Sequence, residues 1–209
     1  MTTENLEDTN VEVKTVNKKR KIFETLETVF IALILAVFIR ATVAEARYIP
    51  SESMIPTLLV HDRLVVEKIS NYIGDLSRGE VLVFYPPEEK FHPPGKKLKD
   101  DVTSKSLRWL GFTSNVAYIK RLIGLPGETV EIKDGLVYIN GKPLEEDYIK
   151  EKPAYEYGPI TLKNDELFMM GDNRNNSQDS HAWGTLPVKN IIGHAIVRFW
   201  PPQRMGLIK

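Results

Sequence analysis

The sequence of 209 residues contains no cysteine, which excludes disulfide bonds, thiolate zinc sites and a cysteine nucleophile. It contains only four histidines, and none of them falls in an HExxH pair or another recognisable metal-binding spacing. We therefore expect no metal and no cofactor. Any hydrolytic chemistry in this chain has to use oxygen or nitrogen groups of the protein itself.

An excess of charge is also lacking, since 28 basic and 28 acidic residues give a formal net charge of +0. Affinity for a phosphate backbone requires a surplus of positive charge, so we expect no nucleic-acid partner. The contents of hydrophobic residues, 42%, and charged residues, 27%, are ordinary for a globular protein. The length is sufficient for one sizeable domain with an anchor, or for two small domains.

The N-terminal apolar run is short, with twelve uncharged residues between Thr28 and Ile39. A spanning helix needs about 20 residues, so a buried core helix is an alternative. However, the run is apolar around its whole circumference, and Glu27 and Arg40 lie near its ends, where long side chains reach the interface. We predict a transmembrane helix over residues 22–45. Cleavage as a signal peptide is a further alternative, but it would leave Ser53 almost at the new N-terminus.

The residues before this helix are polar, and they end in the basic cluster Lys18-Lys19-Arg20-Lys21. A segment so poor in large apolar side chains cannot offset its ordering entropy, so we expect residues 1–21 to be a disordered tail. The basic cluster predicts that this tail is cytoplasmic. Residues 46–209 would then form an extracytoplasmic domain at the cell membrane.

After the helix, the sequence is typical of β-structure. Short runs rich in β-branched and aromatic residues are separated by glycine, proline and Asn-Gly turns, and Lys133-Asp134-Gly135 predicts a tight hairpin. The predicted strands are Arg63–Lys68, Glu80–Tyr85, Val116–Ile123, Thr129–Lys133, Leu136–Asn140 and Ile191–Trp200. We therefore expect a mainly β domain of antiparallel sheets, with residues 91–114 as an insertion or mobile loop.

The first candidate site follows the apolar helix directly. Ser53 lies between Pro50 and Pro56, which restrict the backbone on both sides. A serine in a rigid turn can direct its hydroxyl and its own N–H toward one point, which suits a nucleophile beside an oxyanion hole. Taken alone, the segment is a weak signal, and an ordinary loop is the favoured interpretation.

The second candidate is Lys120, in the predicted strand Val116–Ile123. Period-two alternation places it on one face with Tyr118 and Leu122. Desolvation among such neighbours lowers the pKa of a lysine and allows it to act as a base near neutral pH. The alternative is a surface lysine that extends its amine into water.

The third candidate is the polar run from Met170 to Gly184, which contains Gly171-Asp172-Asn173-Arg174. Such a run can be a structural loop ordered by internal turns, or it can carry a site. Its two acidic residues, Asp172 and Asp179, do not match an EF-hand calcium loop.

The three segments together resemble the type I signal peptidases, the bacterial leader peptidase family, in the order of the motifs and in the residues that form them. The matching strings are Pro-Ser-x-Ser-Met-x-Pro-Thr-Leu, from Pro50, and the Gly-Asp-Asn-Arg loop, from Gly171. The resemblance extends from about Ile22 to Trp200. It implies a membrane-bound serine endopeptidase that uses a Ser-Lys dyad to remove signal peptides from exported preproteins, and a fold similar to that of the self-cleaving repressor proteases.

The resemblance also implies roles for single residues. Ser53 matches the acyl-forming nucleophile and Lys120 the general base. Ser51 matches the side-chain donor of the oxyanion hole, which works beside the Ser53 N–H. Ser177 matches the serine that orients the lysine amine, and Asp179 matches a structural carboxylate.

The implied substrate is an extended peptide with a cleavage site of the Ala-x-Ala type, presented at the surface of a phospholipid membrane. The positions that match the shallow pockets for small side chains are Ile49, Met54, Leu58, Tyr118 and Ile119.

Two positions depart from the family pattern. Glu52 stands where glycine is most common, and we expect its carboxylate to point to solvent, away from the oxyanion hole. His181 stands where many members have an arginine that pairs with the carboxylate equivalent to Asp179. A histidine can still donate to Asp179, but its charge varies near neutral pH, so we expect the loop to be less stable at high pH.

Two other functions are compatible with parts of the sequence. A histidine-dependent serine hydrolase would use His61 or His181 with Ser53. A membrane-tethered β-domain that binds peptides without cleaving them would fit the anchor and the neutral charge, but it gives no reason for the order of the serines and the lysine. A mitochondrial inner-membrane peptidase has similar motifs. A self-cleaving repressor would need a DNA-binding module in place of the apolar segment.

Overall fold

The structure is a computed structural model that describes residues 4–70, 76–87 and 117–208. The chain divides into two compact units, residues 1–40 and residues 41–209. The predicted insertion or mobile loop, residues 91–114, lies outside the described residues.

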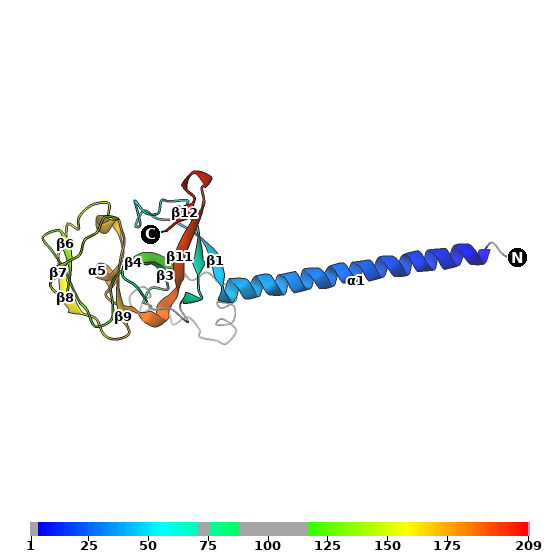
Figure 1. Ribbon diagram of the computed structural model, residues 1–209, viewed down its shortest axis with the longest axis horizontal. Helices are drawn as coiled ribbons and strands as arrows, with labels where there is room; N and C mark the ends of the chain where they lie inside the picture. The colour runs from blue at the N-terminus through cyan, green and yellow to red at the C-terminus, as the bar shows by residue number, and fades with distance from the viewer. Residues whose placement is uncertain (1–3, 71–75, 88–116, 209) are drawn as a thin grey trace, which may run out of the picture. The chain divides into compact units, whose positions relative to one another are not determined.

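The first unit is the helix α1 (Glu4–Thr42), drawn as one continuous helix in Figure 1. Its stretch Arg20–Thr42, 23 residues with a mean hydropathy of 2.3, is long and apolar enough to cross a membrane. The large apolar side chains of this stretch, among them Phe23, Phe30 and Phe38, are exposed in the structure. A core helix would bury such side chains, so the exposure favours a membrane span over the buried core helix.

The limits of α1 differ from the prediction at both ends. The helix begins at Glu4, within the stretch predicted to be disordered, because extending an existing helix requires much less free energy than nucleating one. It ends at Thr42 rather than at residue 45, because Ala44 and Glu45 pair with the next strand along the chain.

The second unit is built from antiparallel strands, which confirms the predicted fold class. One sheet has the strand order β1-β2-β11-β3-β4-β9-β10, with β12 paired to β11, and the other has the order β7-β6-β5-β8. The strands are β1 (Ala44–Tyr48), β2 (Arg63–Glu67), β3 (Val81–Phe84), β4 (Tyr118–Gly124), β5 (Thr129–Lys133), β6 (Leu136–Ile139), β7 (Lys142–Pro143), β8 (Tyr157–Thr161), β9 (Glu166–Met170), β10 (Leu186–Pro187), β11 (Ile191–Trp200) and β12 (Gly206–Leu207).

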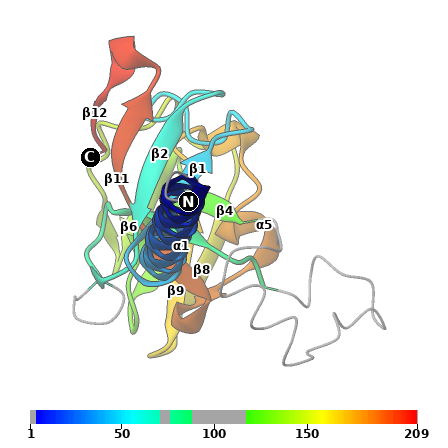
Figure 2. The same ribbon diagram turned by 90° about the vertical axis from the view of Figure 1, so that its right-hand side faces the viewer.

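Short helical turns connect some of these strands. They are the single-turn helix α5 (Ser180–Trp183) and the 3-10 turns η1 (Arg174–Asn176), η2 (Val188–Asn190) and η3 (Pro202–Arg204). Figure 2 shows β2 and β11 side by side, in agreement with their pairing.

The predicted hairpin turns are present in the second sheet. Asp134 and Gly135 join β5 to β6 with φ angles of 51° and 71°, and Asn140 and Gly141 join β6 to β7 with φ angles of 52° and 77°. Two successive residues with positive φ match the right-handed twist of the flanking strands. Asparagine, aspartate and glycine adopt this conformation most readily, which is why these turns are visible in the sequence.

Several strands were not predicted, and β9 is the most important of them. Its sequence, Glu-Leu-Phe-Met-Met, contains no β-branched residue, yet four of its five positions are buried. Pairing with β4 stabilises it as a strand. Packing against neighbours has a larger effect than intrinsic preference at such positions.

Candidate active site

The loop between β1 and β2 carries Ser53. Two hydrogen bonds close its base, from the N–H of Ile49 to the carbonyl of Asp62 at 2.9 Å and from the N–H of His61 to the carbonyl of Ile49 at 2.9 Å. Met54 and Leu58 are fully buried in the hydrophobic core beneath the loop. Ser53 is therefore held in a fixed loop, with only 7% of its surface exposed.

Lys120 lies on β4, a central strand that pairs with β3 on one side and with β9 on the other. Lys120 is only 4% exposed. Its amine donates a hydrogen bond to the Ser53 hydroxyl, with Nζ and Oγ 2.6 Å apart. The two groups are 67 positions apart in the sequence. The fold thus places an amine against a serine hydroxyl in a site from which most water is excluded.

Burial lowers the pKa of the Lys120 amine from 10.5 to about 8, because the charged ammonium loses hydration. The carboxylates of Asp179 and Asp172 act in the opposite direction and raise it. At about pH 7, roughly one lysine in ten is then neutral and able to accept a proton. The group has the acidity that a general base requires.

Ser51 lies two residues before Ser53 and is exposed, and the two hydroxyl oxygens are 3.4 Å apart. Their hydroxyls therefore lie on the same side of the loop. The role of Ser51 in an oxyanion hole stays a prediction.

The loop after β9 binds the serine loop through hydrogen bonds. The N–H of Asn173 donates to the carbonyl of Ser53 and its side-chain amide donates to the carbonyl of Glu52, both at 3.1 Å. Gly171 lies so close that a Cβ there would come within 2.4 Å of the Ser53 carbonyl and within 2.3 Å of the Ser177 hydroxyl. No role was predicted for Gly171 or Asn173, although both belong to the Gly-Asp-Asn-Arg string.

Asp179 is completely buried at the start of α5. One oxygen accepts the N–H of Gly171 at 2.8 Å, and the other accepts the N–H and the Nδ1 of His181 at 3.2 Å and 2.7 Å. Asp179 therefore joins the end of β9 to α5. Ser177 is also buried, but its hydroxyl makes no hydrogen bond within the residues that the structure describes. Its predicted contact with the lysine amine stays a prediction.

A buried ion pair lies beside the lysine. Arg121, which follows Lys120 on β4, donates to both oxygens of Asp172 at 2.8 Å and 2.7 Å, and Thr57 donates to the same carboxylate at 2.5 Å. The guanidinium of Arg121 lies over the ring of Tyr148, with its Cζ 4.0 Å from the ring centroid. This ion pair was not predicted, because Arg121 is on the alternate face of β4 from Lys120 and its partner Asp172 is 51 positions away in the sequence.

The five residues predicted to contact substrate separate into two groups. Ile49, Met54 and Leu58 are at most 2% exposed and belong to the core under the serine loop. Tyr118 and Ile119 are only partly buried, and the ring centroid of Tyr118 lies 5.8 Å from the Lys120 amine. Of the five, Tyr118 and Ile119 therefore have surface available for direct contact in this conformation.

His61 and His181, the two alternative bases, form no hydrogen bond with Ser53 among the described residues. His61 is exposed and its Nδ1 contacts the hydroxyl of Tyr48, while His181 binds Asp179 and stacks on Tyr155 with centroids 4.2 Å apart. Within the described part of the chain, no hydrogen bond joins either imidazole to Ser53. The arrangement does not support a histidine-dependent hydrolase.

Glu52 is exposed, as expected from the sequence. Within the same described part of the chain, there is no cluster of three or more histidine, aspartate or glutamate side chains that could hold a metal ion.

Comparison with known proteins adds independent information. The family of signal peptidases, peptidase S26, matches residues 22–200. Signal peptidase I of Leptolyngbya laminosa is 49% identical over 185 residues, which cover 88% of this chain and 83% of that protein. Signal peptidase I P of Bacillus subtilis subsp. natto is 36% identical over 199 residues, covering 90% and 94%. The crystal structure of a signal peptidase I from Enterococcus faecalis is 27% identical, with a TM-score of 0.40, and covers 57% of this chain and 96% of that one.

Proposed function

The chain belongs to the signal peptidase family, peptidase S26, and from this premise we propose that Ser53 and Lys120 are the pair with which it cleaves its substrates. Membership of the family identifies the chain as a serine endopeptidase that removes signal peptides from preproteins. The alternative of a binding domain without catalysis is therefore not retained. The observation that carries the proposed pair is the 2.6 Å contact between two buried groups, the Lys120 amine and the Ser53 hydroxyl.

The proposed reaction has two stages. The Ser53 oxygen attacks the carbonyl carbon of the scissile bond while neutral Lys120 takes the hydroxyl proton. The tetrahedral oxyanion accepts hydrogen bonds from the Ser53 N–H and the Ser51 hydroxyl. As it collapses, the Lys120 ammonium gives its proton to the departing amine and leaves an ester on Ser53. Lys120 then takes a proton from a water molecule, whose oxygen attacks the ester. As the second tetrahedral intermediate collapses, the Lys120 ammonium returns this proton to the Ser53 oxygen, and the signal peptide leaves with a free carboxylate.

The surrounding residues support this chemistry by position. Asn173 binds the carbonyls on both sides of the Glu52–Ser53 peptide bond, which fixes the direction of the Ser53 N–H. The apolar core under the loop excludes water from the lysine and keeps its pKa low. Asp179 and Ser177 are proposed to position the lysine and its loop.

The test is cleavage of a preprotein with an Ala-x-Ala site by the purified full-length chain in detergent. We expect Ser53→Ala and Lys120→Ala to fold normally and to lose at least about a thousandfold in rate, as removal of one member of a nucleophile–base pair does. Lys163→Ala is the matched control, because the Lys163 side chain is 78% exposed and pairs only with Glu166 among the described residues. Full activity of Lys120→Ala would refute the assigned base.

The chain is membrane-anchored, as its family and its apolar helix indicate. We propose in addition that the N-terminus is cytoplasmic and that residues 46–209 lie outside. The basic cluster Lys18-Lys19-Arg20-Lys21 precedes the span and supports this orientation. The absence of cysteine provides a clean test. A single cysteine at Asn10 should react with an impermeant maleimide only from the cytoplasmic side. A single cysteine at Lys163 should react only from the outer side.

We also propose direct contact of the outer unit with phospholipid. Trp200, Met205 and Leu207 are 49%, 60% and 74% exposed near the end of β11 and on β12. Tryptophan beside other apolar side chains is typical of a surface that enters the membrane interface. Replacing both Met205 and Leu207 by serine should weaken the contact of the outer unit with lipid. The measurement uses the full chain in vesicles that contain brominated lipids, and the expected result is reduced quenching of Trp200 fluorescence.

A further inference from the structure

Glu52 is an exposed acidic residue that directly precedes Ser53, the proposed nucleophile. Within residues 4–70, 76–87 and 117–208 it forms no ion pair, and its one side-chain hydrogen bond there is with the amide of Asn176. Because the side chain is exposed, its charge can act on groups that approach from solvent.

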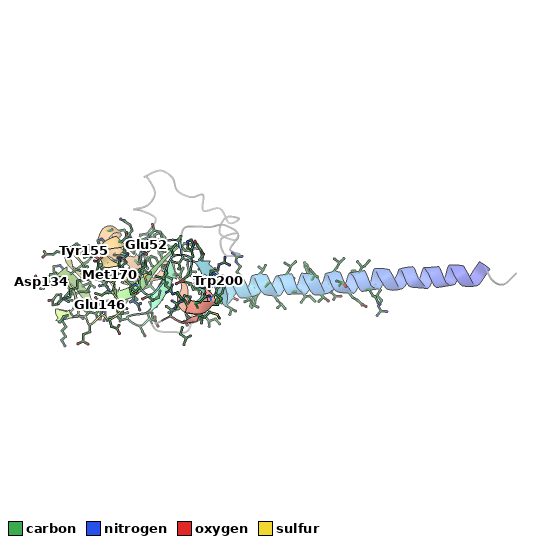
Figure 3. All side chains as sticks on the ribbon, turned by 90° about the horizontal axis from the view of Figure 1, so that it is seen from above. Glu52, Asp134, Glu146, Tyr155, Met170 and Trp200 are labelled. Carbon is green, nitrogen blue, oxygen red and sulfur yellow. The ribbon has the colours of Figure 1, made fainter. Side chains whose placement is uncertain are left out.

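The position of this carboxylate is restrained on one side. The amide of Asn176 lies 3.4 Å from one of its oxygens, and the amide of Asn173 holds the Glu52 carbonyl at 3.1 Å. Both asparagines belong to the loop that also carries Ser177. Figure 3 labels Glu52 and shows Asp134, at the tip of the β5–β6 hairpin, well away from it.

We propose that the Glu52 carboxylate is a specificity-determining group that favours preproteins with a basic residue directly after the scissile bond and disfavours an acidic residue there. The inference rests on the proposed function of Ser53. Under the proposed function, the residue before the bond is the alanine of an Ala-x-Ala site, which brings no charge. The residue after the bond stays within one peptide unit of the attacked carbon, about 3.8 Å between successive Cα atoms. Glu52 is likewise one residue from Ser53, whose oxygen attacks that carbon, so we expect the two side chains to come within about a Debye length of each other, about 8–10 Å.

The expected discrimination is moderate. A charge exposed to water acts through a high effective dielectric constant, so we expect wild type to cleave a lysine substrate about threefold to tenfold faster than a glutamate substrate. Because both ions are exposed, the preference should nearly disappear at about 1 M salt, where the Debye length is about 3 Å.

The experiment compares kcat/KM of the full-length chain in neutral detergent for three preproteins that differ only in the residue after the cut, which is lysine, glutamine or glutamate. Glu52→Gln removes the charge at nearly constant shape, and its lysine-to-glutamate ratio should fall to about one. Glu52→Lys should invert the ratio. Asp134→Asn removes an equal charge at a distant exposed turn, in a conformation that asparagine also adopts, and should keep the wild-type ratio.

The lysine-to-glutamate ratio of kcat/KM is taken within each variant, so a loss of activity that affects all substrates equally leaves it unchanged. An unchanged ratio in Glu52→Gln, or a wild-type ratio that does not respond to salt, overturns the inference. Should Glu52→Gln be inactive, the salt response of wild type decides. If wild type leaves the glutamine substrate uncut, the proposed function fails and this inference fails with it; if it cuts that substrate and shows no charge preference, only the inference fails.

Discussion

At the scale of single residues, the burial that suits Lys120 to its proposed role as a base also makes it destabilising. Its charged form is disfavoured in the folded protein, since the pKa falls from 10.5 to about 8 on burial. Each unit of pKa difference corresponds to about 1.36 kcal/mol between the two protonation states. Below about pH 8 the folded state carries this whole penalty, and between about pH 8 and pH 10.5 stability rises with pH, because the unfolded chain binds more protons.

Lys120→Met should therefore abolish cleavage and stabilise the fold. At about pH 7 we expect a gain of about 1–3 kcal/mol in the free energy of unfolding, because an unneutralised buried cation is removed. The gain should shrink as pH approaches about 10. Urea unfolding of both proteins at the two pH values measures it. A variant that is less stable than wild type at neutral pH would show that the lysine stabilises its site through contacts other than charge.

His181 should stabilise the loop through its contact with Asp179. Its Nδ1 lies 2.7 Å from one oxygen of Asp179, which is completely buried. A buried carboxylate that loses a hydrogen-bond donor is left with its cost of desolvation. We therefore expect His181→Gln to lower the free energy of unfolding by roughly 1 kcal/mol and to keep part of the cleavage rate.

Thermal melting and cleavage of wild type and His181→Gln at one pH are the measurements. A melting temperature unchanged by the substitution would contradict the prediction. Complete loss of cleavage in a folded His181→Gln would instead favour histidine as the base.

At the scale of structural elements, the contact between two loops organises the site. The loop after β9 reaches the serine loop only because residue 171 has no side chain. Gly171→Ala would force its Cβ to 2.4 Å from the Ser53 carbonyl and 2.3 Å from the Ser177 hydroxyl. Neither neighbour can move freely, since Asn173 holds the same carbonyl and Ser177 is buried.

We therefore expect Gly171→Ala to destabilise the chain by about 2 kcal/mol or more and to reduce kcat at least about a hundredfold. Gly206→Ala is the matched control, because a Cβ at that position meets no atom within 4 Å. Urea unfolding and single-turnover cleavage provide the two readouts. Equal behaviour of both variants would show that the two loops adjust to each other.

At the scale of the whole molecule, the division into residues 1–40 and 41–209 predicts separable roles. The hydrophobic core clusters lie in the second unit, so a chain of residues 41–209 should fold without the helix. On a short soluble peptide its kcat/KM should stay within about threefold of the full chain. On a preprotein embedded in vesicles its rate should fall at least about tenfold, since the anchor raises the effective concentration of the enzyme at the membrane.

The full chain, reconstituted in the same vesicles, is measured with the same two substrates for comparison. Equal losses on both substrates would indicate that the first unit supports the fold of the second, and would contradict independent roles.

Features that depend on local chemistry could be predicted from the sequence alone. The apolar run before Arg40, the positive-φ turns at Asp134 and Asn140, and the alternating strands such as β5 and β11 follow from the preferences of residues close together in the chain. The sequence also identified the candidate serine and lysine, through the order of their motifs and the residues that form them. Charge balance and the absence of cysteine limited the chemistry before any contact was known.

Features that depend on pairs of residues far apart in the chain could be seen only in the folded structure. Burial lowers the pKa of Lys120, and burial results from packing between β3 and β9, a strand that its own residues did not predict. The pairing of Arg121 with Asp172 and the approach of Gly171 to Ser53 likewise join segments about 50 and 120 positions apart. Local preferences carry no information about such distances, because the free energy of these contacts exists only once the sheet has brought the segments together.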